Sequence, residues 1–196
     1  GKVTGPSHAP RLAGVLNGSS LSLGSLSVLT SKTTYDVTIP DFDVARVHVK
    51  ADTSASIVDI GRVSMPALEG RWSYGVDGLA FKARASDRTR VLEAAGSLRF
   101  DGAEQEWRLR RIALSANQTS WALAPSTEAV VRVADGQVNA VEPFTLVGTN
   151  QNIVISGRLG ESVSESLVAR LENVDLAFLA PWVNVPAMAG RLNATL

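Results

Sequence analysis

The sequence predicts an all-β protein built on a strongly bent and twisted antiparallel sheet. Apolar and polar residues alternate in about a dozen short runs, the pattern of strands with one dry face and one wet face. Asn-Gly and Asp-Gly pairs recur between these runs, and such pairs favour the tight turns of β-hairpins. Several runs change phase midway, which is typical of the β-bulges that bend a strand.

The chain begins with a segment, residues 1–10, that is rich in Pro, Ser and Gly and is expected to be flexible or loop-like. Alternation starts after it. The clearest runs place an apolar residue or a glycine at every second position: Tyr35, Val37 and Ile39; Leu79, Phe81, Ala83 and Ala85; Ala94, Gly96, Leu98 and Phe100; Ile153, Ile155, Gly157 and Leu159. Each run is predicted to be a half-buried strand.

Turns and bulges are predicted from the residues that interrupt the alternation. Hairpin turns are expected at four pairs: Asn17-Gly18, Asp77-Gly78, Asp101-Gly102 and Asp135-Gly136. One bulge is expected at Gly24, where the phase set by Leu21 and Leu23 gives way to that of Leu26 and Val28. Another is expected between Leu109 and Ile112.

Near the C-terminus the alternation stops, and residues 174–183 are predicted to form a short helix. Asp175 is in place to cap it, and Leu176, Phe178, Leu179 and Trp182 would share one side. Pro181 keeps the helix short. Gly190 then begins a new alternating run that continues to Leu196, and this run is expected to be a strand.

Composition limits the classes of function. Hydrophobic residues make up 45% of the 196 residues, and 19 basic residues balance 19 acidic ones, without the basic excess usual in nucleic-acid binders. Cysteine is absent, which excludes disulfides, zinc-thiolate sites and thiol chemistry from these residues. No apolar stretch approaches the roughly 20 residues of a membrane-spanning helix.

No catalytic motif is recognisable, so the sequence predicts neither an enzyme nor a cofactor. A nucleophile elbow, a phosphate-binding loop and a dinucleotide fingerprint are all missing. Asp41 and Asp43 either bind a cation on one side of a strand or are edge or turn carboxylates beside Pro40. Four tryptophans could form a sugar-binding platform but are more often packing residues: Trp72, Trp107, Trp121 and Trp182.

The last 76 residues carry an ordered series of features. The series comprises a Trp-x-Leu-x-x-Pro opening (Trp121, Leu123, Pro125), a strand with an Asp-Gly turn, a strand of Phe144 and Leu146, an Ile-x-Gly-x-Leu strand (Ile155, Gly157, Leu159), a Leu-x-x-Val-Asp-Leu segment (Leu171, Val174, Asp175, Leu176) and a Gly-x-Leu-x-x-x-Leu strand (Gly190, Leu192, Leu196). In this order the series resembles the TamB family, part of the wider AsmA-like group of bridge-like lipid transfer proteins.

The resemblance implies a periplasmic segment of an inner-membrane-anchored protein of a Gram-negative bacterium. Its sheet would curl into an elongated trough with an apolar interior that shields phospholipid acyl chains during transfer between the inner and outer membranes. A TamA-type outer-membrane barrel protein would be a partner. The apolar faces expected to line such a groove hold Val37, Ile39, Leu79, Phe81, Leu98, Phe100, Leu109, Ile112, Leu114, Val131, Val133, Leu146, Ile153, Ile155 and Leu171.

On this interpretation residues 11–186 form one trough unit, and residues 187–196 begin the next. The alternation alone leaves another architecture open, because it also builds a closed β-sandwich whose inner faces fill each other. The corresponding alternative function is a non-enzymatic module, such as a passenger-type surface domain that binds protein or glycan.

Overall fold

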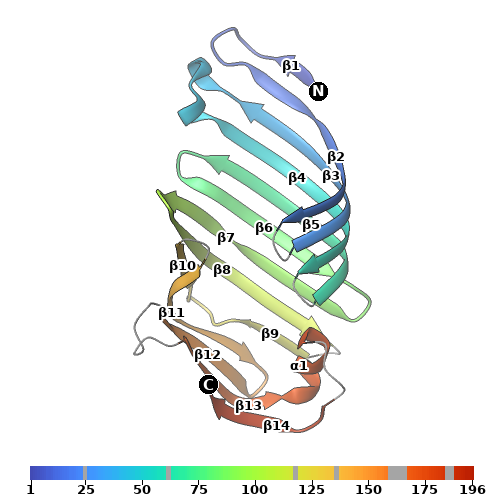
Figure 1. The fold of residues 1–196 in the computed structure, drawn as a ribbon, viewed down its shortest axis with the longest axis vertical. Coiled ribbons are helices and arrows are strands. Elements are labelled where there is room, and N and C mark those ends of the chain that lie inside the picture. Colours follow the sequence, from blue (N-terminus) through green and yellow to red (C-terminus); the bar gives the residue numbers. More distant parts are fainter. Residues whose placement is uncertain (24–25, 61–62, 117–118, 135–136, 159–166, 184–187) are drawn as a thin grey trace. The chain divides into compact units, whose positions relative to one another are not determined.

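The computed structural model describes residues 1–23, 26–60, 63–116, 119–134, 137–158, 167–183 and 188–196. Within these residues the fold is all-β, as predicted: fourteen strands pair antiparallel, and one short α-helix lies near the C-terminus (Figure 1). The helix, α1 (Leu176–Val183), falls within the predicted range. Asp175 caps it as expected, because its Oδ1 accepts a hydrogen bond of 2.9 Å from the Ala177 amide.

The chain divides into two compact units, Gly1–Asp87 and Arg88–Leu196. Unit 1 contains β1 (Lys2–Thr4), β2 (Arg11–Leu23), β3 (Leu26–Thr38), β4 (His48–Ile60), β5 (Val63–Gly75) and β6 (Gly78–Ser86), in that order across the sheet. The first strand lies within the segment expected to be loop-like. Two 3-10 turns, η1 (Pro40–Phe42) and η2 (Val44–Arg46), connect β3 to β4.

Unit 2 contains β7 (Arg90–Asp101), β8 (Glu104–Ala116), β9 (Thr119–Leu123), β10 (Ala129–Ala134), β11 (Gln137–Gly148), β12 (Gln151–Arg158), β13 (Leu167–Asp175), α1 and β14 (Arg191–Thr195). Both β9 and β10 pair with β8 on one side and with β11 on the other. They therefore lie end to end between these two strands. A turn at Pro125 and Ser126 separates them.

Two of the predicted hairpin turns are confirmed. Gly75 pairs with Gly78 around the Asp77 turn, and Asp101 pairs with Glu104 around Gly102. The turn at Asn17-Gly18 is wrong, because both residues lie within β2 and pair with β3. A long run of cross-strand pairs outweighs the local turn preference there. Asp135-Gly136 lies outside the described residues.

The long strands of unit 1 switch the phase of their alternation at one level of the sheet. Ser20 and Ile57 have positive φ angles of 52° and 48°, and the cross-strand pairing skips both residues together with Leu29 and Pro66. Across the switch, two residues that are three apart share a face, and beyond it the ordinary alternation resumes. A Cβ atom added to Gly18, for example, would lie 2.8 Å from the Leu21 side chain.

Gly24, where a bulge was predicted, lies outside the described residues, but the residues on either side of it are described. Leu23 pairs directly with Leu26, and Leu21 with Val28, so the four residues belong to two strands of a hairpin. Their change of phase is the chain reversal itself, and the switch within β2 lies four residues earlier, at Ser20. The bulge predicted between Leu109 and Ile112 is confirmed by a register shift that leaves Arg110 unpaired with β7.

Unit 2 repeats the three-residue spacing at two more register shifts. In β11 the shift lies between Val141 and Phe144, which are both buried in one core cluster. In β13 it lies between Leu171 and Val174, which pack in another cluster, and Asn173 has a φ of 56°. At each bulge the extra residue keeps the apolar side chains before and after it on the same face of the sheet.

Candidate functional site

The candidate site is one face of the sheet in unit 1, here named the apolar face. Rows of directly paired residues cross the strands β2 to β6 on this face. These rows are Leu12–Val37–Val49–Tyr74–Leu79, Gly14–Tyr35–Ala51–Trp72–Phe81, Leu16–Thr33–Thr53–Gly70–Ala83, Gly18–Ser31–Ala55–Leu68–Ala85 and, after the phase switch, Leu21–Val28–Val58–Met65.

No row of the apolar face contains a charged residue. The charged residues of the same strands alternate onto the opposite face: Arg11, Lys32, Asp36, Lys50, Asp52, Asp59, Glu69, Arg71, Lys82 and Arg84. Several of them pair there across neighbouring strands. Arg71 Nε lies 2.9 Å from Asp52 Oδ1, and Arg11 donates to Asp36 and lowers the pKa of that carboxyl.

The apolar face is only partly covered. Its side chains remain well exposed at Leu16 (64%), Leu21 (50%) and Tyr74 (42%), whereas Val58 and Met65 are buried. Among the described residues of unit 1, the strands belong to one hydrogen-bonded sheet, and the only helical segments are η1 and η2. A closed sandwich would bury such a face beneath a second sheet. Proteins rarely expose large apolar side chains to water over a continuous surface.

Two aromatic side chains of the apolar face lie over glycines of neighbouring positions. A Cβ on Gly70 would come within 2.7 Å of the Trp72 indole, and one on Gly14 within 2.7 Å of the Tyr35 hydroxyl oxygen. Trp72 also stacks against Phe81, with ring centroids 6.0 Å apart. The large rings therefore lie along the sheet, and the glycines provide the room for them.

Two hydroxyl groups on the apolar face, those of Thr33 and Thr53, are hydrogen-bonded to each other. The indole Nε1 of Trp72 donates to Thr53 Oγ1 at 3.2 Å, and the hydroxyls of Thr53 and Thr33 are 2.9 Å apart. A short chain of hydrogen bonds thus crosses three strands and presents little free hydrogen-bonding capacity to a ligand.

The predicted groove residues of unit 1 lie on or beside the apolar face. Val37 and Leu79 belong to one row, and Phe81 belongs to the next. Ile39 follows the end of β3, and its amide donates to the Pro10 carbonyl at 3.1 Å, so it lies outside the paired rows. Sequence reasoning missed Leu12, Leu16, Tyr35 and Trp72. The sequence feature that could have identified Leu16 and Trp72 is the glycine that lies two residues before each of them.

In unit 2 most of the predicted groove residues pack into hydrophobic clusters. One cluster has Ala116, Trp121, Val174 and Phe178 at its centre, with Leu114, Leu146, Ile153, Leu171 and Trp182 packed against it. The other has Leu123, Ala129, Val141 and Phe144 at its centre, with Leu109, Ile112, Val131, Leu146 and Ile155 around it. Leu98 is also buried, Val133 is half-buried and Phe100 is exposed.

Helix α1 covers part of this face of unit 2. The ring of Phe178 lies 5.8 Å from that of Trp121 and 6.3 Å from that of Trp182, centroid to centroid. The guanidinium of Arg90 lies over the Trp182 ring at 5.7 Å. Trp121 and Trp182 therefore act as packing residues, as their positions in the sequence suggested. The side chain of Leu179, predicted for the same helix side, lies outside the described residues.

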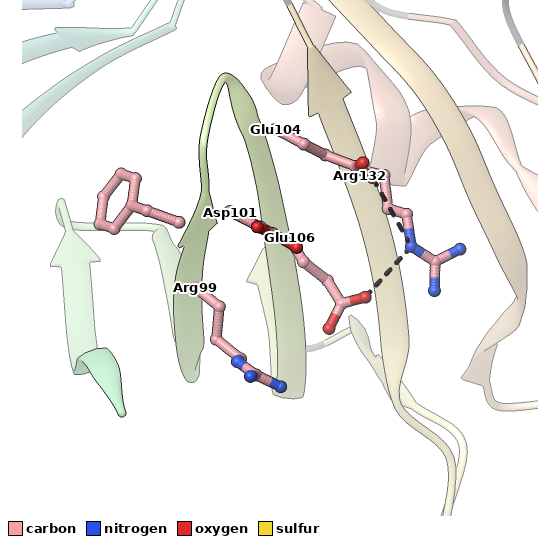
Figure 2. Close-up of a pocket in the computed structure, with 6 residues that line it drawn as sticks. Arg99, Asp101, Glu104, Glu106 and Arg132 are labelled. Atoms are coloured by element: carbon pink, nitrogen blue, oxygen red, sulfur yellow. Dashed lines mark hydrogen bonds and ion pairs between the residues drawn. The ribbon is translucent and has the colours of Figure 1, made fainter. Parts of the chain in front are cut away.

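A pocket of about 410 Å³ lies on the charged side of unit 2, and it is lined by Arg99, Phe100, Asp101, Glu104, Glu106 and Arg132 (Figure 2). Arg132 Nε lies 3.1 Å from Glu106 Oε2 and 3.9 Å from Glu104 Oε1. Arg108 donates to Glu106 at 2.7 Å, and this bond, with that from Arg132, lowers the pKa of Glu106. The charges neutralise one another across β8 and β10, as in a structural network.

Asp41 and Asp43 are turn carboxylates, one of the two interpretations that the sequence left open. They lie in and beside η1, and both pair with Arg46, at 2.5 Å and 3.0 Å. Asp43 also accepts a hydrogen bond from the Ala45 amide. Within the described part of the chain, no group of three or more His, Asp and Glu side chains is placed to hold a metal ion.

Comparisons with protein-family models, with curated proteins and with solved structures find no match to this chain. In the part of the chain that the structure describes, no helix has both the length and the apolar character needed to cross a membrane.

Proposed function

We propose that this chain shields the acyl chains of phospholipids on the apolar face of unit 1. The observation that carries the proposal is a charge-free sheet face, several strands wide, on which large side chains such as Leu16, Leu21 and Tyr74 stay exposed. An acyl chain is the chemical complement of such a surface, because it offers apolar area and requires no hydrogen bonds.

The energetic argument rests on the hydrophobic effect. Each methylene group removed from water contributes about 0.8 kcal/mol, so even partial coverage of one acyl chain offsets a large hydration cost. The flat rings of Tyr35 and Trp72 and the mutually bonded threonines leave few polar groups that would hold a lipid at one point. A surface of this kind suits a ligand that moves along it better than one held in a deep pocket.

The resemblance of residues 121–196 to the TamB family supplies the biological setting of the proposal. In that setting the chain is a periplasmic segment of an inner-membrane-anchored protein, and its sheet forms part of an apolar trough for phospholipid transfer to the outer membrane. Outer-membrane biogenesis, with a TamA-type barrel protein as partner, is the corresponding cellular role. The mechanism requires no catalytic residue.

The alternative, a β-sandwich or passenger-type module that binds protein or glycan, needs its apolar faces to fill each other. The pairing of the described strands of unit 1 into one sheet and the exposure of Leu16 and Leu21 favour an open face instead.

The proposal is tested by measuring bound lipid after incubation with phospholipid vesicles, by native mass spectrometry and lipid extraction. Val37→Lys places a charge within a row on the apolar face, and lipid occupancy is expected to fall at least fivefold. Thr34→Lys is the matched control, because Thr34 lies on the opposite face of the same strand.

Circular dichroism checks that each variant is folded. Leu16→Lys is a second variant, at a more exposed position of the apolar face, for use if Val37→Lys does not fold. Equal lipid occupancy in the wild-type protein, the folded apolar-face variant and the Thr34→Lys control would contradict the proposal. So would the absence of any lipid on the wild-type protein.

A further inference from the structure

Two connections between strands of unit 1 expose large apolar side chains. The β3–β4 connection, residues 39–47, exposes Phe42 (67%) and Val44 (77%), and the β5–β6 hairpin, residues 75–78, exposes Val76 (68%). Both connections lie at the same end of the strands, because β4 begins beside the end of β5 (Figure 1). These two connections are together named the loop end.

The backbone of the first connection holds Phe42 in a conformation that phenylalanine rarely adopts. Asp41 and Phe42 have φ angles of 51° and 56°, in the left-handed region that is costly for most residues other than glycine. The Asp41 amide donates to the His8 carbonyl at 2.6 Å, and the Asp43 amide donates to the Pro40 carbonyl at 2.9 Å. Hydrogen bonds thus fix a strained turn whose largest apolar side chain is left in water. Strain of this kind is typical of functional positions.

The charged groups of the loop end are few and mostly paired. Arg46 lies 2.5 Å from Asp41 and 3.0 Å from Asp43, so the β3–β4 connection has two carboxylates and one guanidinium. Asp77 in the hairpin adds one further carboxylate. Without a basic excess the loop end has no attraction to an anionic surface, and its apolar tips are complementary to a partner without net charge.

We propose that the loop end inserts Phe42, Val44 and Val76 into the surface of a phospholipid bilayer. Separate side chains that protrude from two tight connections need a partner that adapts to each of them. The fluid boundary between headgroups and acyl chains does so without preformed pockets, and insertion removes the apolar area of the tips from water. The choice of a phospholipid bilayer rests on the proposed function, because the apolar face would take its lipid from such a membrane.

The loop end is continuous with the apolar face. Tyr74 belongs to the row of this face nearest the β5–β6 hairpin, its side chain is 42% exposed, and Val76 follows two residues later. Leu79, at the other side of the hairpin, ends the same row. A lipid that leaves a bilayer held at the loop end therefore meets this row of the apolar face first.

Flotation of the full chain with phosphatidylcholine vesicles tests the docking. The wild-type protein is expected to float with the vesicles, and Phe42→Asn/Val44→Ser is expected to bind them at least tenfold more weakly. Asparagine tolerates a φ of 56° better than phenylalanine, so this variant is expected to fold at least as well as wild type. Val15→Ser/Leu29→Ser is the matched control, because it removes two exposed apolar side chains within strands, and it is expected to bind like wild type.

A fluorescent reporter measures insertion directly. The chain has no cysteine, so Val44→Cys can carry a single environment-sensitive dye. Vesicles are expected to shift the emission of this dye to shorter wavelength and to leave unchanged the emission of the same dye at Leu29→Cys.

A folded wild-type protein that does not float with phosphatidylcholine vesicles would overturn the proposal, and a protein partner would then be the better explanation of the exposed tips. A Phe42→Asn/Val44→Ser variant that binds like wild type would also overturn it, because another surface would then make the contact. So would binding that requires anionic phosphatidylglycerol, because charge would then drive it.

A phospholipid with short acyl chains, kept below its micelle concentration, reaches the apolar face without a bilayer. Its occupancy therefore tests the proposed function alone. The loop-end variant is expected to bind this lipid as wild type does while failing to float with vesicles. A wild-type protein that floats with vesicles but binds no monomeric lipid would contradict the proposed function and leave the docking in place.

Discussion

Glu106 shows how single residues hold the charged side of unit 2 together. Its carboxylate accepts hydrogen bonds from Arg108 and Arg132, which come from its own strand and from β10. Both bonds favour the ionised form and lower the pKa of Glu106 below its ordinary value of 4.5. The contribution to stability is therefore complete above that value, and it is lost as the pH falls through the lower pKa of the folded state.

Glu106→Gln is expected to lower the free energy of unfolding at pH 7 by about 0.5–1 kcal/mol, the range of partly exposed ion pairs. The difference from wild type should shrink as the pH falls from 4.5 to 2, because the wild-type carboxylate becomes protonated. Urea unfolding at several pH values measures this, with Asp77→Asn in an exposed turn as control. A difference that is constant over this pH range would show that the ionised form of Glu106 is not the source of the stabilisation.

Gly96 is a second residue whose identity has a clear physical reason. It lies where β7 and β8 approach each other closely, at the bulge of β8. A Cβ at this position would lie 2.1 Å from the carbonyl oxygen of Arg108, which is backbone and cannot rotate away. Gly96→Ala is expected to destabilise the protein by about 1–3 kcal/mol in thermal or urea unfolding.

Gly102→Asn is the control for that measurement. Gly102 has a φ of 59° with nothing within 4 Å of an added Cβ, and asparagine tolerates this conformation. A Gly96 variant as stable as the Gly102 variant would show that the strands can separate at the bulge without cost.

At the scale of elements, helix α1 is held by packing, because eight residues are too few for a stable isolated helix. Phe178 is its most buried described side chain, at 5% exposure, and it lies between two tryptophan rings. Phe178→Ala is expected to cost about 3 kcal/mol of unfolding free energy and to weaken the near-ultraviolet dichroism of the tryptophans.

Ala177→Ser, on the exposed side of the same helix, is expected to change stability by less than about 0.5 kcal/mol. If both helix variants were equally stable, the helix would not be docked through Phe178.

Much of the element list follows from local chemistry that a sequence displays. Alternation predicts the strands, Asp77 and Asp101 mark hairpins, and Asp175 caps the helix. Asn17-Gly18 misled the turn prediction, because turn preference is local whereas the register of β2 and β3 is set by twelve residue pairs. The bulge at Arg110 was visible because apolar residues change phase there within a single strand.

The candidate site was predictable only in part. Val37, Leu79 and Phe81 were found because they alternate within clear runs. Tyr35 belongs to the same run as Val37 but was not included in the predicted lining, whereas Trp72 lies outside the clearest runs and needed its cross-strand neighbours to be known. Most of the predicted lining residues in unit 2 proved to be packed in clusters, several of them around α1. Alternation reveals which face is apolar, but it does not reveal whether another element covers that face.

At the scale of the whole molecule, the two units differ in how fully their apolar surface is buried. Among the described residues, unit 1 has three buried apolar side chains, Val58, Met65 and Ala85, whereas unit 2 has ten, including Trp121 and Phe178. The free energy of opening follows buried apolar area, so unit 1 is expected to open more readily than unit 2.

Hydrogen exchange read by mass spectrometry measures this difference. Amides in β3 and β4 are expected to exchange at least tenfold faster than those in β11 and β12, although all four strands are paired on both sides. A phospholipid with short acyl chains, kept below its micelle concentration, is expected to slow the exchange in β3 and β4. Equal exchange rates in both units without lipid would contradict the expectation that unit 1 opens more readily than unit 2.

The three-residue spacing at the bulges also determines which changes of chain length the sheet can tolerate. Deleting one residue between Gly18 and Leu21, or between Val141 and Phe144, would leave these flanking residues two apart, so a regular strand would keep both on the same face. Deleting two residues would make them adjacent and turn every side chain beyond that point to the opposite face. Related sequences are therefore expected to differ by single residues at these bulges and by pairs of residues elsewhere in the strands.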